Sequence, residues 1–427
     1  MQRLLKLIGV IAILTLFLAA CGQTGTTTEE EAPAGDTAAE GEATEGEAAE
    51  GEATEGEDTT ATEGAVSGDI TLWHAYGSGG AEEKVLGQLI ENAQAEFPDA
   101  NITVLAIPFD QLFNKFETEA ATGGGPDVFV APNDSLVRQV EAGLLMPLDD
   151  MLAGQLDSAS PVAIEGSTVN GELYAVPQSL KAVGLFYNKE AVETPPTTTD
   201  ELLEAVQNGA TLGLNQNAYH SFGFFVGFGG ELMNEEGVCI ADQGGFTEAM
   251  EYLVELKEAG AQFFTDGGAA ANAFQTGDLD MLVDGPWNTG NFAETLSDNL
   301  GVAPVPAGPA GPAGPLTGVD GFYINVSAQN PEGAVALAQF LTNPDSMQLY
   351  IDEAGHVPTD STLEISDEVT QGFADSALNG YPRPQKIELD NFWTAFDNMV
   401  SQVMEGQATP ADAVAEACST MNQANGK

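Results

Sequence analysis

Apolar residues in the main part of the chain follow two alternating periodicities. Short runs of β-branched and aromatic residues at 70–74, 102–107 and 128–131 predict strands. Between them, apolar side chains recur near helical spacing in the segments 82–97 and 111–121. Strands that alternate with helices predict an α/β domain with a mostly parallel sheet, whose ligands bind beyond the carboxyl ends of the strands.

A second alternation starts at the strand-like run 185–188 and continues through the helical segments 200–207 and 246–259. Residues 69–427 are numerous and apolar enough to form a large core, and their number indicates two domains. The segment 304–315, rich in Gly and Pro, is too short for a collagen triple helix and predicts an exposed loop.

Two dipeptides predict helix starts. Asn330-Pro331 and Thr409-Pro410 each place a capping side chain before a proline at the first helical position. Trp73 lies within a strand-like run and is expected in the core.

The N-terminus has a different pattern. Arg3 and Lys6 precede an apolar run that ends at Ala20, too short for a membrane span and typical of a secretion signal over residues 1–20. Small residues before Cys21 match a bacterial lipobox, so we expect Cys21 to be lipidated and to anchor the chain at the outer face of the cell membrane. The alternatives are an ordinary signal peptide with an incidental cysteine and an uncleaved anchor. In each case the body lies outside the cytoplasm, in a periplasm or on the cell surface.

Residues 21–68 predict a disordered acidic stalk. Beyond Cys21 this segment consists mainly of Glu, Thr, Ala and Gly, without lysine, arginine or aromatic residues. Such a composition cannot bury enough apolar area to offset the entropy of ordering, and its like charges extend the chain. An acidic tail that binds cations or a partner is the alternative.

Charge narrows the choice of partners. The chain has 11 Lys and Arg against 66 Asp and Glu, a net charge of −55, and only nine of its basic residues lie beyond Cys21. Nucleic acid requires a basic surface, so we expect no nucleic-acid partner. The balance also disfavours anionic ligands, although a helix N-terminus can still bind one.

Two cysteines remain after Cys21. An exported compartment permits a disulfide between Cys239 and Cys418, and two unpaired buried thiols are the alternative.

Motifs for chemistry are missing from the sequence. It contains no Gly-x-Ser-x-Gly elbow, phosphate-binding loop or dinucleotide fingerprint, and its three histidines lack the spacing of a metal motif. We therefore expect no catalytic residue, metal or cofactor, and no enzyme activity. A glycan-active enzyme that uses paired carboxylates and an adhesive surface protein are the alternatives from other classes.

Four motifs in the same order resemble family 1 extracellular solute-binding proteins, the maltose-binding-protein group. They are ITLWHAYGSGGAEE at 70–83, ATGGGPDVFVAPNDSLVRQVEAGLLMPLDD at 121–150, LYAVPQSLKAVGLFYNK at 173–189 and MLVDGPW at 281–287. The resemblance runs from Asp69 to about Asn425 and implies an α/β fold of two lobes, the type II periplasmic-binding-protein fold, with a ligand cleft between them.

The resemblance also implies how the lobes divide. The N-terminal lobe is expected to comprise 69–180 and 318–355, and the C-terminal lobe 181–317 and 356–427, with chain crossings near Leu180, Leu316 and His356. The implied function is that of the substrate-binding lipoprotein of a bacterial ABC importer. It captures a sugar or oligosaccharide and delivers it to the transmembrane permease subunits, as a monomer. A polyol, glycerophosphodiester or peptide in the same role is the alternative.

Ligand contacts come from the resemblance, supported by the chemistry of sugars. Sugar rings stack their C–H faces on aromatic rings, and their hydroxyls bind carboxylates, amides and backbone groups. Trp287 and Tyr219 match family positions that stack on sugar, Trp393 approximately matches a third, and Asp134 matches a carboxylate that accepts from hydroxyls. Each aromatic residue has a core position as its alternative, and Asp134 a solvated helix cap.

Further contacts are expected from the turn after the first strand and from basic residues. His74, Tyr76 and Ser78 lie in that turn, and Arg383 is one of the few cations, with a surface salt bridge as its alternative. Lys181 is also expected to contact the ligand. Ala131 and Lys181 stand where the maltodextrin-binding branch carries a tryptophan and a glutamate, so the resemblance implies a sugar ligand but does not identify it as maltose.

Overall fold

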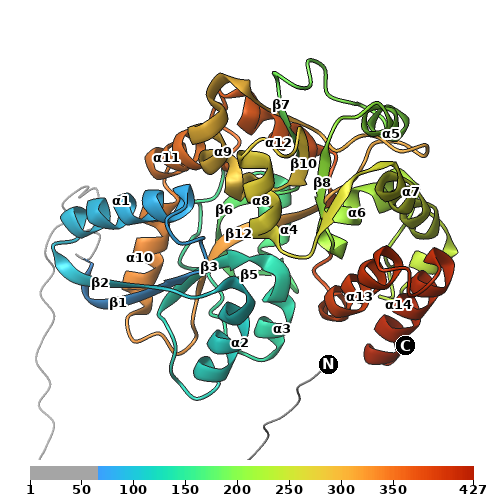
Figure 1. The fold of residues 1–427 in the computed structure, drawn as a ribbon. Coiled ribbons are helices and arrows are strands. Elements are labelled where there is room, and N and C mark those ends of the chain that lie inside the picture. The colour runs from blue at the N-terminus through green and yellow to red at the C-terminus, as the bar shows by residue number, and fades with distance from the viewer. Residues whose placement is uncertain (1–65) are drawn as a thin grey trace, which may run out of the picture. The chain divides into compact units, whose positions relative to one another are not determined.

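The computed structural model describes residues 66–427. The predicted signal 1–20, Cys21 and most of the predicted acidic stalk lie outside the described residues. The described part contains a seven-stranded sheet and a five-stranded sheet, each packed against helices (Figure 1). None of its helices has the length and apolar character needed to cross a membrane.

The first sheet has the strand order β13-β6-β12-β3-β1-β2, and β14 pairs with β12. All strands and helices predicted between residues 70 and 131 form, with boundaries shifted by a few residues. β1 begins at Ser67, because Ser67 and Gly68 pair with β2, so these two residues of the predicted stalk belong to a strand. The elements of this part are β1 (Ser67–His74), α1 (Ala81–Glu96), β2 (Asp99–Ala106), α2 (Phe109–Ala120), β3 (Val128–Pro132), α3 (Leu136–Glu141), α4 (Pro161–Gly166), β4 (Thr168–Val169), β5 (Glu172–Leu173), β6 (Ala175–Lys181), β12 (Leu316–Ile324), α10 (Pro331–Leu341), α11 (Pro344–Ala354), β13 (Val357–Pro358) and β14 (Tyr381–Pro382).

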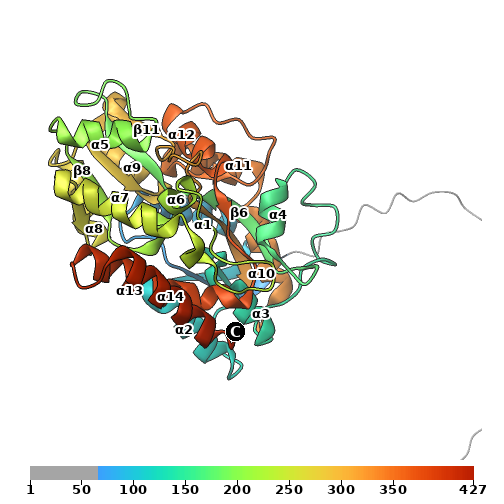
Figure 2. The same ribbon diagram turned by 90° about the vertical axis from the view of Figure 1, so that its right-hand side faces the viewer.

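The second sheet has the order β11-β7-β10-β8-β9. The predicted strand at 185–188 and the helices at 200–207 and 246–259 are confirmed. In Figure 2, α13 and α14 lie beside α7, on which α14 packs. The elements are β7 (Gly184–Asn188), α5 (Thr199–Gln207), β8 (Leu212–Asn215), α6 (Ala218–Gly227), α7 (Phe246–Ala259), β9 (Gln262–Phe264), α8 (Gly267–Gln275), β10 (Met281–Asp284), α9 (Thr289–Leu296), β11 (Leu300–Ala303), α12 (Glu368–Leu378), α13 (Phe392–Met404) and α14 (Pro410–Ala424).

Both sheets are mixed, which corrects the expectation of mostly parallel sheets. β1 pairs in parallel with β2 and β3, but β12 arrives from the second sheet and runs antiparallel to β3 and β6. In the second sheet, β10 is parallel to β8 and antiparallel to β7. The strands that return late in the chain therefore complete each sheet in the opposite direction.

Each sheet has its own apolar core. Val85, Leu86 and Leu89 of α1 pack with β-strand residues in the first, and aromatic residues around Phe222 dominate the second. Trp73 is buried as expected, and the Lys115 ammonium lies 4.6 Å from the centre of its ring. Both predicted helix starts are confirmed: the Asn330 and Thr409 side chains accept backbone N–H groups of α10 and α14.

The Gly- and Pro-rich loop is only partly exposed, contrary to the expectation. Pro309 and Ala310 are exposed, but Val305 and Pro315 are buried, and the loop backbone packs on α6. A Cβ atom at Gly308 would lie 2.2 Å from the carbonyl oxygen of Gly227, so only glycine permits this contact.

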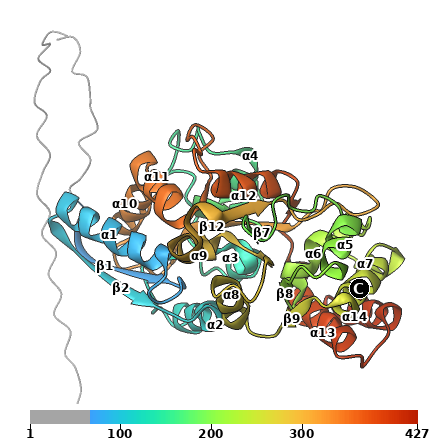
Figure 3. The same cartoon turned by 45° about the horizontal axis from the view of Figure 1, so that its top comes forward.

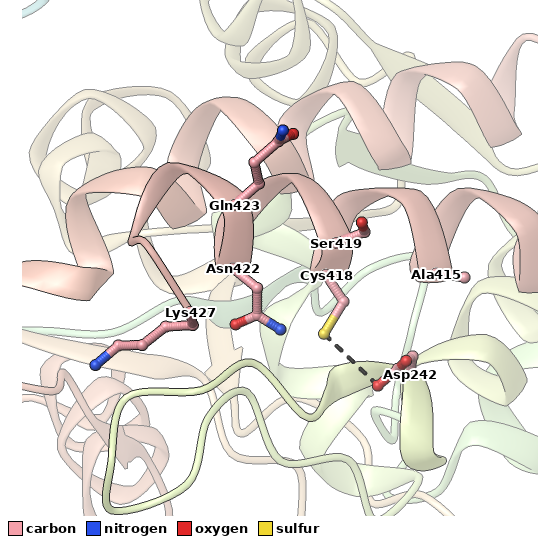
Figure 4. A pocket seen from close by; sticks show the side chains of 7 residues that line it. All are labelled: Asp242, Ala415, Cys418, Ser419, Asn422, Gln423 and Lys427. Atoms are coloured by element: carbon pink, nitrogen blue, oxygen red, sulfur yellow. Dashed lines mark hydrogen bonds between the residues drawn. The ribbon is translucent and has the colours of Figure 1, made fainter.

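Cys239 and Cys418 form a disulfide, with Cα atoms 5.5 Å apart. It joins the chain just before α7 to α14 across a sequence separation of 179 residues. Figure 4 shows Cys418 on α14 beside a surface pocket, with its sulfur 3.6 Å from an oxygen of Asp242. Because a disulfide sulfur carries no proton, this approach is a contact and not a hydrogen bond.

We predict that the double substitution Cys239→Ser/Cys418→Ser lowers the free energy of unfolding by about 2–4 kcal/mol, because the bridge restricts a long loop of the unfolded chain. Urea unfolding at pH 7 measures the change. Dithiothreitol should destabilise the native protein and leave the double variant unaffected, and equal stability of both proteins without reductant would contradict the prediction.

Candidate functional site

Four of the predicted ligand contacts gather around a fifth, the guanidinium of Arg383. Its Nη1 donates to the Asp134 carboxylate, and its central carbon lies 5.8 Å from the ring centre of Tyr219 and 5.4 Å from that of Trp393. The rings of Tyr219 and Trp287 are 6.1 Å apart. These five residues, Asp134, Tyr219, Trp287, Arg383 and Trp393, are called the Arg383 cluster below.

The cluster draws on both sheets. Asp134 lies in a short helix (Asn133–Ser135) directly after β3, at the carboxyl end of a strand of the first sheet. Tyr219 is in the first turn of α6, which the Asn217 side chain caps, and Trp393 is in the first turn of α13. Arg383 follows β14, whose Tyr381 ring packs 5.4 Å from Phe222 in the second core. A carboxylate from one half of the molecule therefore meets aromatic rings from the other.

Three residues that sequence reasoning missed hold this arrangement. The Asn133 Oδ1 accepts from Arg383 at 3.2 Å and from the backbone of Val319 at 3.2 Å. A Cβ at Gly318 would lie 2.7 Å from Nη1 of Arg383, and one at Gly285 would lie 2.1 Å from the ring of Trp287. Both glycines therefore let a functional side chain lie directly on the backbone. The motif Gly285-Pro286-Trp287 was a sequence signal from which the role of Gly285 could have been predicted, whereas no motif marked Gly318.

Burial decides the charge state of the cluster. Arg383 is only 6% exposed, and Asp134 neutralises it. Burial raises the pKa of Asp134 above its ordinary value, although Arg383 acts in the opposite direction. Burial likewise raises the pKa of Tyr219, so its hydroxyl stays protonated and can donate a hydrogen bond.

A pocket of about 390 Å³ lies beside Trp287 in the second half of the molecule. Asp284 is buried there and accepts from the Gly285 backbone and from Asn288, each at 2.8 Å. The Oδ1 of Asn215, also buried, has no partner among the described residues. The lining residues are Asn215, Gln216, Asn217, His220, Phe264, Thr265, Gly267, Gly268, Ala271, Asp284, Trp287 and Asn288. Aromatic carbon beside buried amides and a carboxylate suits a ligand with both C–H faces and hydroxyls.

Lys181 lies in a buried charge network instead of offering its ammonium to a ligand. Its Nζ is 2.6 Å from Glu82 of α1, 3.5 Å from Asp320 of β12 and 3.1 Å from Nε2 of His356. Burial alone would raise the pKa of Glu82, but Lys181 and His356 lower it to about 2. Burial raises the pKa of Asp320 to about 6, against the attraction of Lys181. The ammonium of Lys181, an expected ligand contact, is thus engaged by internal ion pairs, and its contact with a ligand stays a prediction.

The three residues of the first turn lie near this network. His74 is buried, and its Nδ1 accepts the backbone N–H of Tyr76 at 3.2 Å. The Tyr76 ring centre is 6.4 Å from that of His356, and Ser78 is exposed. Among the hydrogen bonds and ring contacts of residues 66–427, none joins His74, Tyr76 or Ser78 to the Arg383 cluster.

His356 is held neutral at the centre of the network. Its Nε2 lies 2.7 Å from Glu82 and its Nδ1 3.0 Å from the Gln178 amide nitrogen, so a single proton on Nε2 satisfies both contacts. Burial, with help from Lys181, lowers the pKa of His356 to about 4. A base with a lowered pKa in the folded state binds fewer protons there than in the unfolded chain, so its stabilisation is lost as pH falls from about 6.5 to about 4.

We predict that His356→Gln reduces the loss of stability on acidification. Between pH 7 and pH 5, His356 should lower the free energy of unfolding of the native protein by about 2 kcal/mol. The variant, which lacks the imidazole, should not show this decrease. The contribution of Asp320 to stability changes with pH in the opposite direction. Its raised pKa means that the folded state gains stability as pH falls from about 6 towards 3.8. The control Asp320→Asn should therefore steepen the loss. Urea unfolding at both pH values measures the differences, and identical pH slopes for native protein and His356→Gln would refute the assignment.

We predict that Asp134→Asn lowers the free energy of unfolding by about 3 kcal/mol, because it leaves the buried Arg383 without its counter-charge. The matched control is Glu117→Gln, which removes the carboxylate from the more exposed ion pair with Arg138 and should cost at most about 1 kcal/mol. Urea unfolding at pH 7 separates the two, and equal costs would argue against a buried, charge-paired Arg383.

Two α/β lobes joined by several chain crossings, with charged and aromatic side chains meeting between them, define a two-lobe binding protein of the type II periplasmic fold. The family model for bacterial extracellular solute-binding proteins matches residues 88–375, and the chain belongs to this family. The family is one of solute-binding proteins and not of enzymes.

Known relatives match most of the chain. The maltotriose-binding protein of Pyrococcus abyssi is 26% identical over 79% of this chain and 78% of its own length. The galactooligosaccharide-binding protein of Bacillus subtilis is 24% identical over 79% and 87%. Among solved structures, the GacH receptor of Streptomyces glaucescens, studied with acarbose, superposes with a TM-score of 0.79 at 25% identity, covering 84% of this chain and 98% of that one. The maltotriose-binding protein of Thermus thermophilus gives 0.75 at 27% identity, over 83% and 99%.

Proposed function

We propose that this protein is the substrate-binding lipoprotein of a bacterial ABC importer, which captures a sugar or oligosaccharide between its lobes. The observation that carries the proposal is the Arg383 cluster, where Tyr219, Trp287 and Trp393 supply stacking faces around a carboxylate and a guanidinium. The relatives bind maltotriose or galactooligosaccharides by name, and a Streptococcus pneumoniae relative, 23% identical, is named as a maltooligosaccharide ABC transporter solute-binding lipoprotein.

The charges of the site favour an uncharged ligand. Asp134 pairs with Arg383, and Glu82 and Asp320 pair with Lys181, so these buried cations are already neutralised among the described residues. A phosphate or carboxylate ligand would have to displace one of those carboxylates at a high desolvation cost. Hydroxyl groups can instead share Asp134, Asn133 and the polar wall of the pocket beside Trp287 without changing the net charge. A sugar therefore fits better than a glycerophosphodiester.

The lobe division follows the sheets. One lobe contains the first sheet and the other contains the second, with crossings after Lys181, at the start of β12 and after β13. β13 pairs with β6, and Ser361 still bonds to Ser158, so the third crossing lies beyond Ser361 rather than near His356. Lys181 sits at the end of the first crossing strand, and its ion pairs tie that strand to α1 and β12 of the same lobe.

Import needs an anchor and a permease. Lipidation at Cys21 and an acidic stalk to about residue 66 would hold the monomeric body at the outer face of the membrane, where its ligand-bound form docks on the transmembrane subunits. The ligand is released unchanged, since the site is assigned no catalytic residue, metal or cofactor, and transport energy comes from the ATPase of the importer.

Isothermal titration of the protein with maltotriose, galactooligosaccharides, a polyol, a glycerophosphodiester and a peptide tests the proposal. We expect a sugar to bind, and Trp287→Ala to weaken that binding roughly tenfold or more through loss of a stacking face. Trp287→Phe, which keeps an aromatic face, is the matched control and should lose less. If only a ligand of another chemical class binds, the importer role stands and the sugar assignment is wrong. If Trp287→Ala binds with unchanged affinity, the Trp287 ring does not contact the ligand.

A further inference from the structure

The first turn of α9 is wedged between the start of α1 and the end of α11. A Cβ at Gly290 would lie 2.4 Å from the Cβ of Ala81 and 3.0 Å from the carbonyl oxygen of Glu353. A Cβ at Gly355, which ends α11 in the left-handed conformation, would lie 2.6 Å from the side chain of Thr289. Backbone meets side chain here at distances that only glycine allows. Ala81, Thr289, Gly290 and Gly355 are called the seam below.

The seam joins the two lobes. Val85 of α1 and Tyr350 of α11 belong to the core of the first sheet. Phe292 of α9 packs 4.9 Å from both Phe186 and Phe274, ring centre to ring centre, in the core beside the second sheet. Figure 3 shows α1 and α11 on one side of α9 and the helices of the second lobe on the other. The contact is therefore an interface between lobes and not packing within one.

The same turn carries a proposed ligand contact. Trp287 lies in a short helix (Pro286–Asn288) that runs directly into α9, and this helix also contacts α1 and α11. Thr289 and Gly290 of the seam thus follow the stacking ring on one continuous stretch of backbone. Any wedge that moves Gly290 away from Ala81 moves Trp287 relative to the first lobe.

We propose that Gly290 is a positioning residue for ligand capture: its bare backbone lets the lobes meet at Ala81, and the meeting places Trp287 against a ligand held by the first lobe. This inference rests on the proposed function. The Lys84–Glu294 ion pair crosses the same two helices at 3.1 Å, but both side chains are largely exposed and contribute little. In this proposal, steric fit at the seam, and not charge, sets how closely α9 approaches α1 and α11.

The test compares three variants of the full chain. Gly290→Ala adds the Cβ that meets Ala81, and Ala81→Gly/Gly290→Ala removes the opposing Cβ. Gly87→Ala is the matched control, because Gly87 is an exposed glycine of α1 with nothing within 4 Å of an added Cβ. Alanine favours a helix over glycine at positions 290 and 87, so lost helix propensity cannot explain an effect of either single variant.

Hydrogen exchange of the ligand-free protein, detected by mass spectrometry, measures the local stability of the helices at the seam. Gly290→Ala should speed amide exchange at the start of α1 and the end of α11, while amides of α7 stay at the native rate and report an intact fold. The double variant should recover the native pattern, and Gly87→Ala should not depart from it. Amide exchange at the native rate in Gly290→Ala would overturn the seam.

Titration with maltotriose measures whether packing at the seam affects ligand affinity. Gly290→Ala should weaken binding roughly tenfold, as expected for an added methyl in a filled contact, with recovery in the double variant. Unchanged or tighter binding would overturn the positioning role even if exchange changes. If the native protein binds none of the sugars tested, the proposed ligand class fails, and the exchange measurement still decides the seam.

Discussion

Burial of positive charge is the constraint on which the first lobe and its contact with Arg383 of the second lobe depend. The chain carries few cations beyond Cys21, yet Lys181 and Arg383 are each about 6% exposed. A buried cation is tolerated only with a counter-charge and satisfied hydrogen bonds. Glu82, Asp320 and Asp134 meet that requirement from three different elements, so α1, β12 and the turn after β3 must all be in place before either cation can leave water.

These pairs also link local structure to binding. Arg383 reaches Asp134 only because Gly318 leaves its guanidinium room against β12, and Asn133 fixes the same group to the backbone of that strand. The guanidinium then lies beside Tyr219 and Trp393, so the same ion pair also positions Arg383 against the rings of the proposed ligand site.

Local pattern predicted the elements well, because helices and strands follow from periodicity and caps within a few residues. The expectation of a mostly parallel sheet was wrong. β12 returns to the first sheet after more than a hundred residues in the second half of the molecule, and no local pattern predicts its direction. β13 and β14 are too short to carry a pattern at all. The resemblance gave Asp134, Tyr219, Trp287 and Trp393, which lie close together in the structure, and their contacts with a ligand stay predictions. The ion pairs of Lys181 had no local signal, because its partners Glu82 and His356 stand 99 and 175 positions away in the chain.

The disulfide has a consequence for a member of an extracellular solute-binding family. Cys239 and Cys418 both belong to the second lobe, and the chain between them includes the excursion into the first sheet and the exposed tip at Pro309 and Ala310. Loop tips of this kind are where extracellular proteases cut. A single cut there leaves both fragments covalently joined through the bridge, so a nicked molecule can keep both lobes and remain one particle.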